Sequence, residues 1–133
     1  MRRLGHLLIM ISLPLWGWGQ FSLLGSAQQL GGDCVLIGVN YYDNGQNWEG
    51  AAFIYHGSSS GLSTTAATQL ESNQASAEFG GSVASAGDVN GDGYSDVIVG
   101  ADLYDNGQTN EGAAFIYHGS SFGLSTTAAT QLE

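Results

Sequence analysis

Oxygen-bearing side chains recur at alternate positions in one short segment, residues 88–96. Asp88, Asn90 and Asp92 take its first, third and fifth positions, and Asp96 takes its ninth. Calcium takes about six to eight oxygen ligands, and a tight loop can turn such side chains toward one ion. The backbone carbonyl of Tyr94 would add a further oxygen. The spacing therefore predicts a calcium-binding loop with Asp88, Asn90, Asp92, Tyr94 and Asp96 as its ligands.

We call this segment the acidic loop. Its residues also test three other interpretations: an EF-hand, a dockerin-like loop and a solvated turn. An EF-hand needs Glu at loop position 12, and a dockerin-like loop would need Asp there, but position 12 is Val99. A solvated acidic turn without an ion stays open as an alternative. It is disfavoured because three converging carboxylates with no basic partner would repel one another strongly.

Two further strings resemble a catalytic motif. Residues 57–61 and 119–123 both read Gly-x-Ser-x-Gly, the pattern of a hydrolase nucleophile elbow. That elbow must lead from a strand into a helix, whereas Leu62 and the following Ser and Thr residues are a poor helix start. We expect hairpin turns here, strand positions for His56 and His118, and no enzymatic activity.

The charge balance excludes several classes of partner. The chain has a formal net charge of -10, and its only basic residues are Arg2 and Arg3. Nucleic-acid binding and attraction to an anionic membrane both need clustered cations, so neither is expected. Cys34 is the only cysteine, which leaves no possibility of an intrachain disulfide. We expect it to be a buried small apolar residue.

A long internal repeat organises most of the chain. Residues 43–71 recur as residues 105–133, and only three positions differ between the two copies. Within one unit, short alternating or apolar runs at residues 81–86, 96–100, 112–118 and 130–133 predict four strands. Four short strands per repeat are typical of one blade of a β-propeller. The predicted fold is therefore all-β, a partial β-propeller of under two four-stranded antiparallel blades, as in a truncated or fragmentary propeller.

Phe79-Gly80, the acidic loop and the segment at residues 97–101 follow one another in the order of a known motif. Together they resemble an FG-GAP repeat of the integrin-alpha propeller type, and the resemblance covers most of residues 28–133. It implies a calcium loop between the first two strands of a blade, and a role in adhesion or protein interaction. Asp102 stands where the family expects proline.

The first copy departs further from this pattern. Gly17-Trp18 replaces Phe79-Gly80, and the positions of the four side-chain ligands hold other residues: Ser26, Gln28, Leu30 and Cys34. We therefore expect residues 28–78 to form a degenerate blade without this calcium site, and residues 79–133 to form the blade with the intact loop.

Residues 1–27 have the three parts of a secretory signal: two arginines, an apolar run and small residues. We expect cleavage after Gly19 or Ala27, no membrane span after cleavage, and a secreted or cell-surface location. An uncleaved anchor is the alternative, because apolar residues continue to Leu24 and approach the roughly 20 that span a bilayer.

These features favour a secreted or surface-exposed, non-catalytic calcium-binding segment for cell adhesion or for binding a protein or other extracellular ligand. Since repeat units need neighbours to cover their apolar faces, we also expect further blades or self-association. Two alternatives stay open. One is an accessory propeller segment of a secreted hydrolase of the glycosylphosphatidylinositol-specific phospholipase D type, and the other is a gene remnant.

Overall fold

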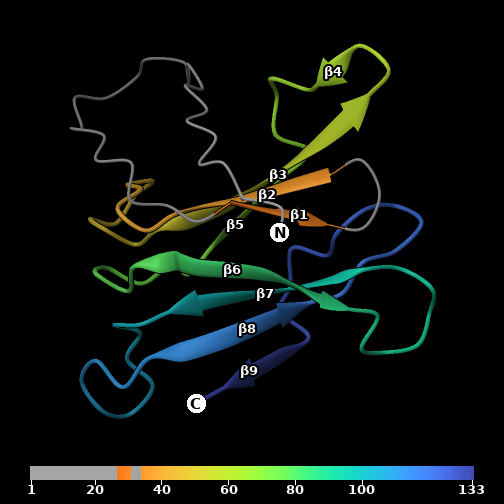
Figure 1. The fold of residues 1–133 in the computed structure, drawn as a ribbon. Coiled ribbons are helices and arrows are strands. Elements are labelled where there is room, and N and C mark those ends of the chain that lie inside the picture. Colours follow the sequence, from red (N-terminus) through yellow and green to blue (C-terminus); the bar gives the residue numbers. More distant parts are fainter. Residues whose placement is uncertain (1–26, 31–33) are drawn as a thin grey trace, which may run out of the picture.

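The computed structural model describes residues 27–30 and 34–133, which form two antiparallel sheets stacked on one another (Figure 1). This part of the chain contains strands but no helix. The first sheet holds β1 (Ala27–Leu30), β2 (Cys34–Val39), β3 (Ala51–Ser58), β4 (Gly61–Leu62) and β5 (Thr68–Glu71). The second holds β6 (Phe79–Gly87), β7 (Asp96–Ala101), β8 (Ala113–Tyr117) and β9 (Thr130–Leu132).

Both sheets repeat the same strand order. In the second sheet β6, β7, β8 and β9 are neighbours in sequence order, and every pair is antiparallel. In the first, β1, β2, β3 and β5 follow the same path, while β4 forms a short hairpin with the end of β3. Two four-stranded antiparallel units confirm the predicted all-β, partial-propeller fold.

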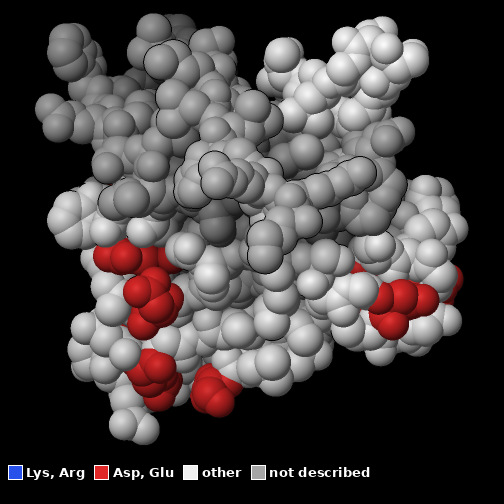
Figure 2. Space-filling view, viewed as in Figure 1, with Lys and Arg blue, Asp and Glu red and all other residues white. Residues whose placement is uncertain are grey.

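The β6–β7 connection carries acidic surface at the right of Figure 2.

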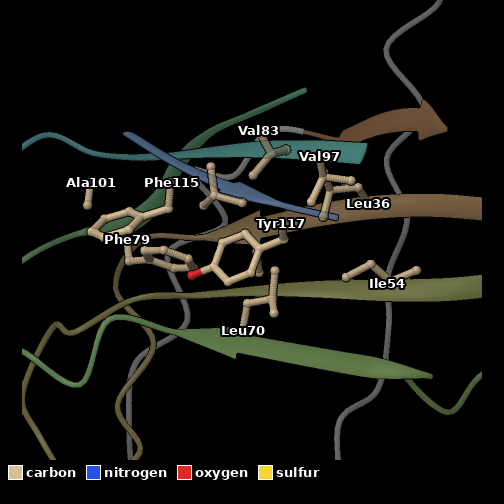
Figure 3. Packing of buried hydrophobic residues seen from close by; sticks show 11 residues of the cluster. Leu36, Ile54, Leu70, Phe79, Val83, Val97, Ala101, Phe115 and Tyr117 are labelled. Atoms are coloured by element: carbon tan, nitrogen blue, oxygen red, sulfur yellow. The ribbon is translucent and has the colours of Figure 1, made fainter. Parts of the chain in front are cut away.

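The hydrophobic core lies between the two sheets (Figure 3). Phe79 is fully buried at its centre, with ring centroids 5.6 Å from Phe115 and 6.3 Å from Tyr117. Burial of each such side chain contributes roughly 1.5–3 kcal/mol. The first sheet contributes Leu36, Ala52, Ile54 and Leu70 to this core. The second contributes Phe79, Val83, Val97, Val99, Ala101, Phe115 and Tyr117.

The internal repeat places the same residues in two different environments. Ile54 and Ile116 are equivalent positions, yet Ile54 is buried between the sheets and Ile116 lies half-buried on the outer face of the second sheet. Strand pairing places Ile98 and Ala114 on that same outer face, with Leu132 beside Ala114. The second sheet therefore presents outward the kind of surface that the first sheet buries.

The sheets are joined by a close backbone contact at the start of β6. Phe79 N donates to the carbonyl of Glu49 at 3.0 Å, and Glu78 N donates to the carbonyl of Trp48 at 3.1 Å. Gly50 has φ +76°, and a Cβ there would lie 2.1 Å from the carbonyl oxygen of Phe79. Only glycine combines this backbone angle with this approach.

Candidate metal centre

The acidic loop connects β6 to β7, which are antiparallel partners whose ends are held by the pairing of Gly87 with Asp96. It therefore lies between the first two strands of the second sheet, at one end of the sheet. Gly91 and Gly93 have φ of +76° and +92°, which allows the chain to turn sharply twice within a few residues.

Carboxylate and amide oxygens hold the loop in its curled form. Asp88 Oδ1 accepts from Gly91 N at 2.8 Å and from Asp92 N at 3.0 Å, and Asp88 Oδ2 accepts from Gly93 N at 2.8 Å. Asn90 Oδ1 accepts from Asp92 N at 3.0 Å, while Asp92 Oδ1 accepts from Tyr94 N at 2.9 Å. Charge-assisted bonds to backbone N–H groups are stronger than neutral ones. The sequence of the loop thus folds these side chains inward along its own backbone.

Asp96 has a structural position as well as a predicted ligand role. It is fully buried at the start of β7, where Oδ2 accepts from Val89 N at 2.9 Å and Oδ1 accepts from Gly119 N at 2.8 Å. These two bonds tie the acidic loop to the end of β8. Sequence spacing did not indicate the second of them, because Gly119 lies 23 residues further along the chain.

The donor set fits a hard cation. All the predicted ligands are oxygens, the kind of donor that calcium prefers. An oxygen of a carboxylate or amide has two lone pairs, and Asn90 Oδ1 and Asp96 Oδ1 each use one in the bonds given above. Asn90 Nδ2 donates a hydrogen bond to Asp92 Oδ2 at 2.9 Å. Within the two described ranges, however, no three Asp, Glu, His or Cys side chains already converge as a metal-binding group. The loop brings Asp88, Asn90 and Asp92 close together, and Asp96 is linked to the loop through Val89 N.

The first copy has a different structure at the equivalent place. Residues 27–30, the counterparts of residues 89–92, form strand β1 and pair with β2. Cys34 takes the place of Asp96 and is half-buried, with its Sγ 2.9 Å from His56 Nδ1 on the neighbouring strand. Ser26 lies outside the described residues.

The two Gly-x-Ser-x-Gly strings form turns. Ser58 Oγ donates to the carbonyl of Gly61 at 3.1 Å, and Ser120 Oγ donates to the carbonyl of Gly123 at 2.8 Å. Residues 57–62 continue as the β3–β4 hairpin. The serine hydroxyls thus stabilise the turns in both copies.

One buried carboxylate was not predicted from the sequence. Glu49 is fully buried, whereas its counterpart Glu111 is exposed. The local sequence carried no signal for this burial, because the same residues, Gly-Ala-Ala-Phe, follow both glutamates.

Comparison with known proteins places the second sheet in a family. Residues 79–117 match the FG-GAP repeat. The chain is 34% identical to human Integrin alpha-11 over 87 residues, which cover 65% of this chain and 7% of the integrin. It is 34% identical to human Integrin alpha-6 over 94 residues, which cover 71% of this chain and 8% of that integrin. It is 46% identical to Caenorhabditis elegans Integrin alpha pat-2 over 55 residues, which cover 41% of this chain and 4% of that integrin. The matched segments thus span less than a tenth of each of these relatives. With the fold and the motif order in agreement, the chain belongs to the FG-GAP repeat proteins and is integrin-alpha-like.

Proposed function

We propose that this chain is a calcium-stabilised, non-catalytic FG-GAP segment that is exported from the cell and takes part in adhesion or in binding a protein or other extracellular ligand. The observation that supports the proposal is the acidic loop, in which oxygens of Asp88, Asn90 and Asp92 accept from backbone N–H groups of the same loop. No Lys or Arg within the described ranges can balance its charge.

The residues that would hold calcium are Asp88, Asn90, Asp92 and Asp96, with the carbonyl of Tyr94. The bound ion would supply positive charge that removes the repulsion among the three carboxylates. Asp96 also holds Gly119 N, so the effect of binding reaches the end of β8. Because binding to the folded state adds to folding free energy, a ligand at one hundred times its Kd would stabilise the chain by about 2.7 kcal/mol.

The proposed role in adhesion comes from the family. The relatives are named as integrin alpha chains, and this chain matches a small part of them. The apolar outer face of the second sheet supports a need for further blades or for another copy of the chain, because repeat units bury such faces against neighbours.

The proposed export and domain limits rest on sequence. The signal at residues 1–27 lies outside the described residues. We propose that cleavage occurs near residue 19 or 27, and that residues 28–78 and 79–133 act as a degenerate and an intact blade. No membrane-spanning helix is found among the described residues. Mass spectrometry of the exported chain should give a mature start at residue 20 or 28, and an intact Met1 on a cytoplasmic protein would contradict this.

Thermal unfolding tests the calcium proposal. The midpoint of the wild-type chain should rise by several degrees when calcium replaces a chelator, and magnesium should substitute poorly because it requires strict octahedral geometry. The comparison is made in a chain that also carries Glu49→Gln, which removes the buried carboxylate at the sheet junction. There Asp92→Ala should lose most of the rise, whereas Glu111→Ala, which removes an exposed charge outside the loop, should keep it. An equal rise with and without Asp92→Ala would reject the assignment.

A further inference from the structure

The carboxylate of Glu49 is enclosed but only half satisfied. Its side chain is 0% exposed. Oε1 accepts from Asn44 N at 2.7 Å, while Oε2 is buried without a hydrogen-bond partner. Buried polar groups are almost always paired, and a buried charge left without a partner is strongly destabilising. An oxygen in this state indicates that a further group belongs beside it.

The β5–β6 connection and the start of β6 contact the loop at residues 43–49. The backbone carbonyl of Glu49 accepts from Phe79 N and from Ser72 Oγ, both at 3.0 Å. We call residues 43–49 the Glu49 loop. In the second copy, Glu111 in the same local sequence is exposed and no described sheet packs on it. Burial of Glu49 is therefore a property of the junction between the sheets.

Two more carboxylates lie around this position. Asn44 joins two of the acids, because its N–H donates to Glu49 and its Nδ2 donates to Glu71 Oε1 at 2.7 Å. Asp43 Oδ1 accepts from Trp48 N at the other end of the loop. The hydrogen bonds of Asp43 and Glu71 each use one carboxylate oxygen, which leaves the second oxygen of each for another partner.

The cluster of Glu49, Glu71 and Asp43 carries negative charge that no nearby basic residue balances. Burial raises the pKa of Glu49, and the negative charges of Glu71 and Asp43 add to the rise. Hydrogen bonding from the backbone N–H groups of Asn44 and Gln46 opposes it. The described ranges contain no Lys or Arg to balance these charges. Gln46 on the same loop carries another buried oxygen, Oε1, without a partner.

We propose that the Glu49 loop and the end of β5 form a second cation site, in which Glu49 Oε2 anchors a hard divalent cation such as Ca²⁺. In this structure the carboxylates of Glu49, Glu71 and Asp43 do not converge as a metal-binding group, so binding requires Glu71 and Asp43 to turn their second oxygens toward the ion. The donors are all oxygens of Asp and Glu, as calcium requires. The site is separate from the acidic loop, and the ion in it neutralises charge at the junction of the two sheets.

The test uses the full chain carrying Asp92→Ala, so that the acidic loop does not contribute. Tb³⁺ is the probe, because its luminescence is sensitised by a nearby indole and Trp48 adjoins Glu49. Excitation of tryptophan should give Tb³⁺ emission that Ca²⁺ displaces. Adding Glu49→Gln should weaken binding at least tenfold, whereas the matched change Glu111→Gln should leave binding unchanged.

The free energy of unfolding gives a second readout. If Glu49 had only a structural role, the effect of Glu49→Gln on this free energy would have the same sign with and without Ca²⁺. In chelator, Glu49→Gln should be at least as stable as its parent, because it removes an unbalanced buried charge. In Ca²⁺ the order should reverse. Glu71→Gln serves as a second variant if Glu49→Gln fails to fold, and it should weaken Ca²⁺ displacement severalfold. Equal Tb³⁺ and Ca²⁺ affinity in the Glu49→Gln and Glu111→Gln chains would overturn the site. The site would also be overturned if Glu49→Gln and its parent had the same order of stability in chelator and in Ca²⁺.

Discussion

Replacing Ile54 and Ile116 separately by alanine compares one residue type in two copies of the same local sequence. Ile54 is 3% exposed and packs in the core between the sheets, while Ile116 lies half-buried on the outer face. Ile54→Ala removes buried methyl and methylene groups and leaves a cavity, which costs roughly 2–5 kcal/mol. Ile116→Ala removes the same atoms without opening an enclosed cavity. The change removes three carbons, each contributing about 0.8 kcal/mol when fully buried. Because Ile116 is half-buried, its loss should cost about 1 kcal/mol.

Urea unfolding followed by circular dichroism measures both losses, at a protein concentration low enough to prevent association. Strand propensity changes equally in the two variants, since both positions are central strand residues, and it cancels in the comparison. A difference of at least about 1 kcal/mol in the free energy of unfolding is expected, with similar m-values. Equal losses at the two positions would refute the packing of β3 against the second sheet.

Three further predictions follow from the same structure. Gly50→Ala should destabilise the chain far more than Gly112→Ala in the same urea assay, since both have φ +76° but only the first places a Cβ 2.1 Å from a carbonyl oxygen; similar losses would contradict the close contact at the sheet junction. Burial, with a smaller contribution from Tyr104, raises the pKa of Tyr117 from 10.0 to about 12. Its contribution to stability is complete below pH 10 and is lost as the pH rises toward 12, by up to about 2.7 kcal/mol. Tyr117→Phe should therefore make unfolding between pH 10 and 12 less steep, and an unchanged profile would show that Tyr117 does not titrate there. Ile116→Asp should reduce association in sedimentation velocity while the monomer stays folded, and undiminished association would show that the outer face is not a contact surface.

The sequence was sufficient for the four strands of the second sheet and their order, but it did not predict β1 or β4 in the first. β-Branched residues such as Val97, Ile98 and Val99 are enriched in strands, and the run is bounded by glycine and an acidic turn, so β7 begins at the predicted residue. The acidic loop was located by the alternation of Asp88, Asn90 and Asp92, which is a local property of the chain. Its turns follow directly from hydrogen bonds between residues five or fewer positions apart.

Differences between the two copies could not be predicted, because they depend on neighbours rather than on local sequence. Glu49 and Glu111 precede the same apolar strand, and Ile54 and Ile116 lie within it, yet only the first of each pair is covered by a following sheet. The structural bond from Gly119 N to Asp96 likewise depends on how β8 lies beside β7. Long-range packing decides these environments, and two copies of one local sequence do not reveal which of them packs against the other sheet.

Calcium titration calorimetry on the full chain carrying Glu49→Gln tests the central claim most directly, since this background leaves the acidic loop as the proposed site. The account predicts a single-site isotherm, and predicts that adding Asp92→Ala removes it because a central carboxylate ligand and its charge are lost. Equal calcium affinity with and without Asp92→Ala would contradict the assignment of the acidic loop as the calcium site.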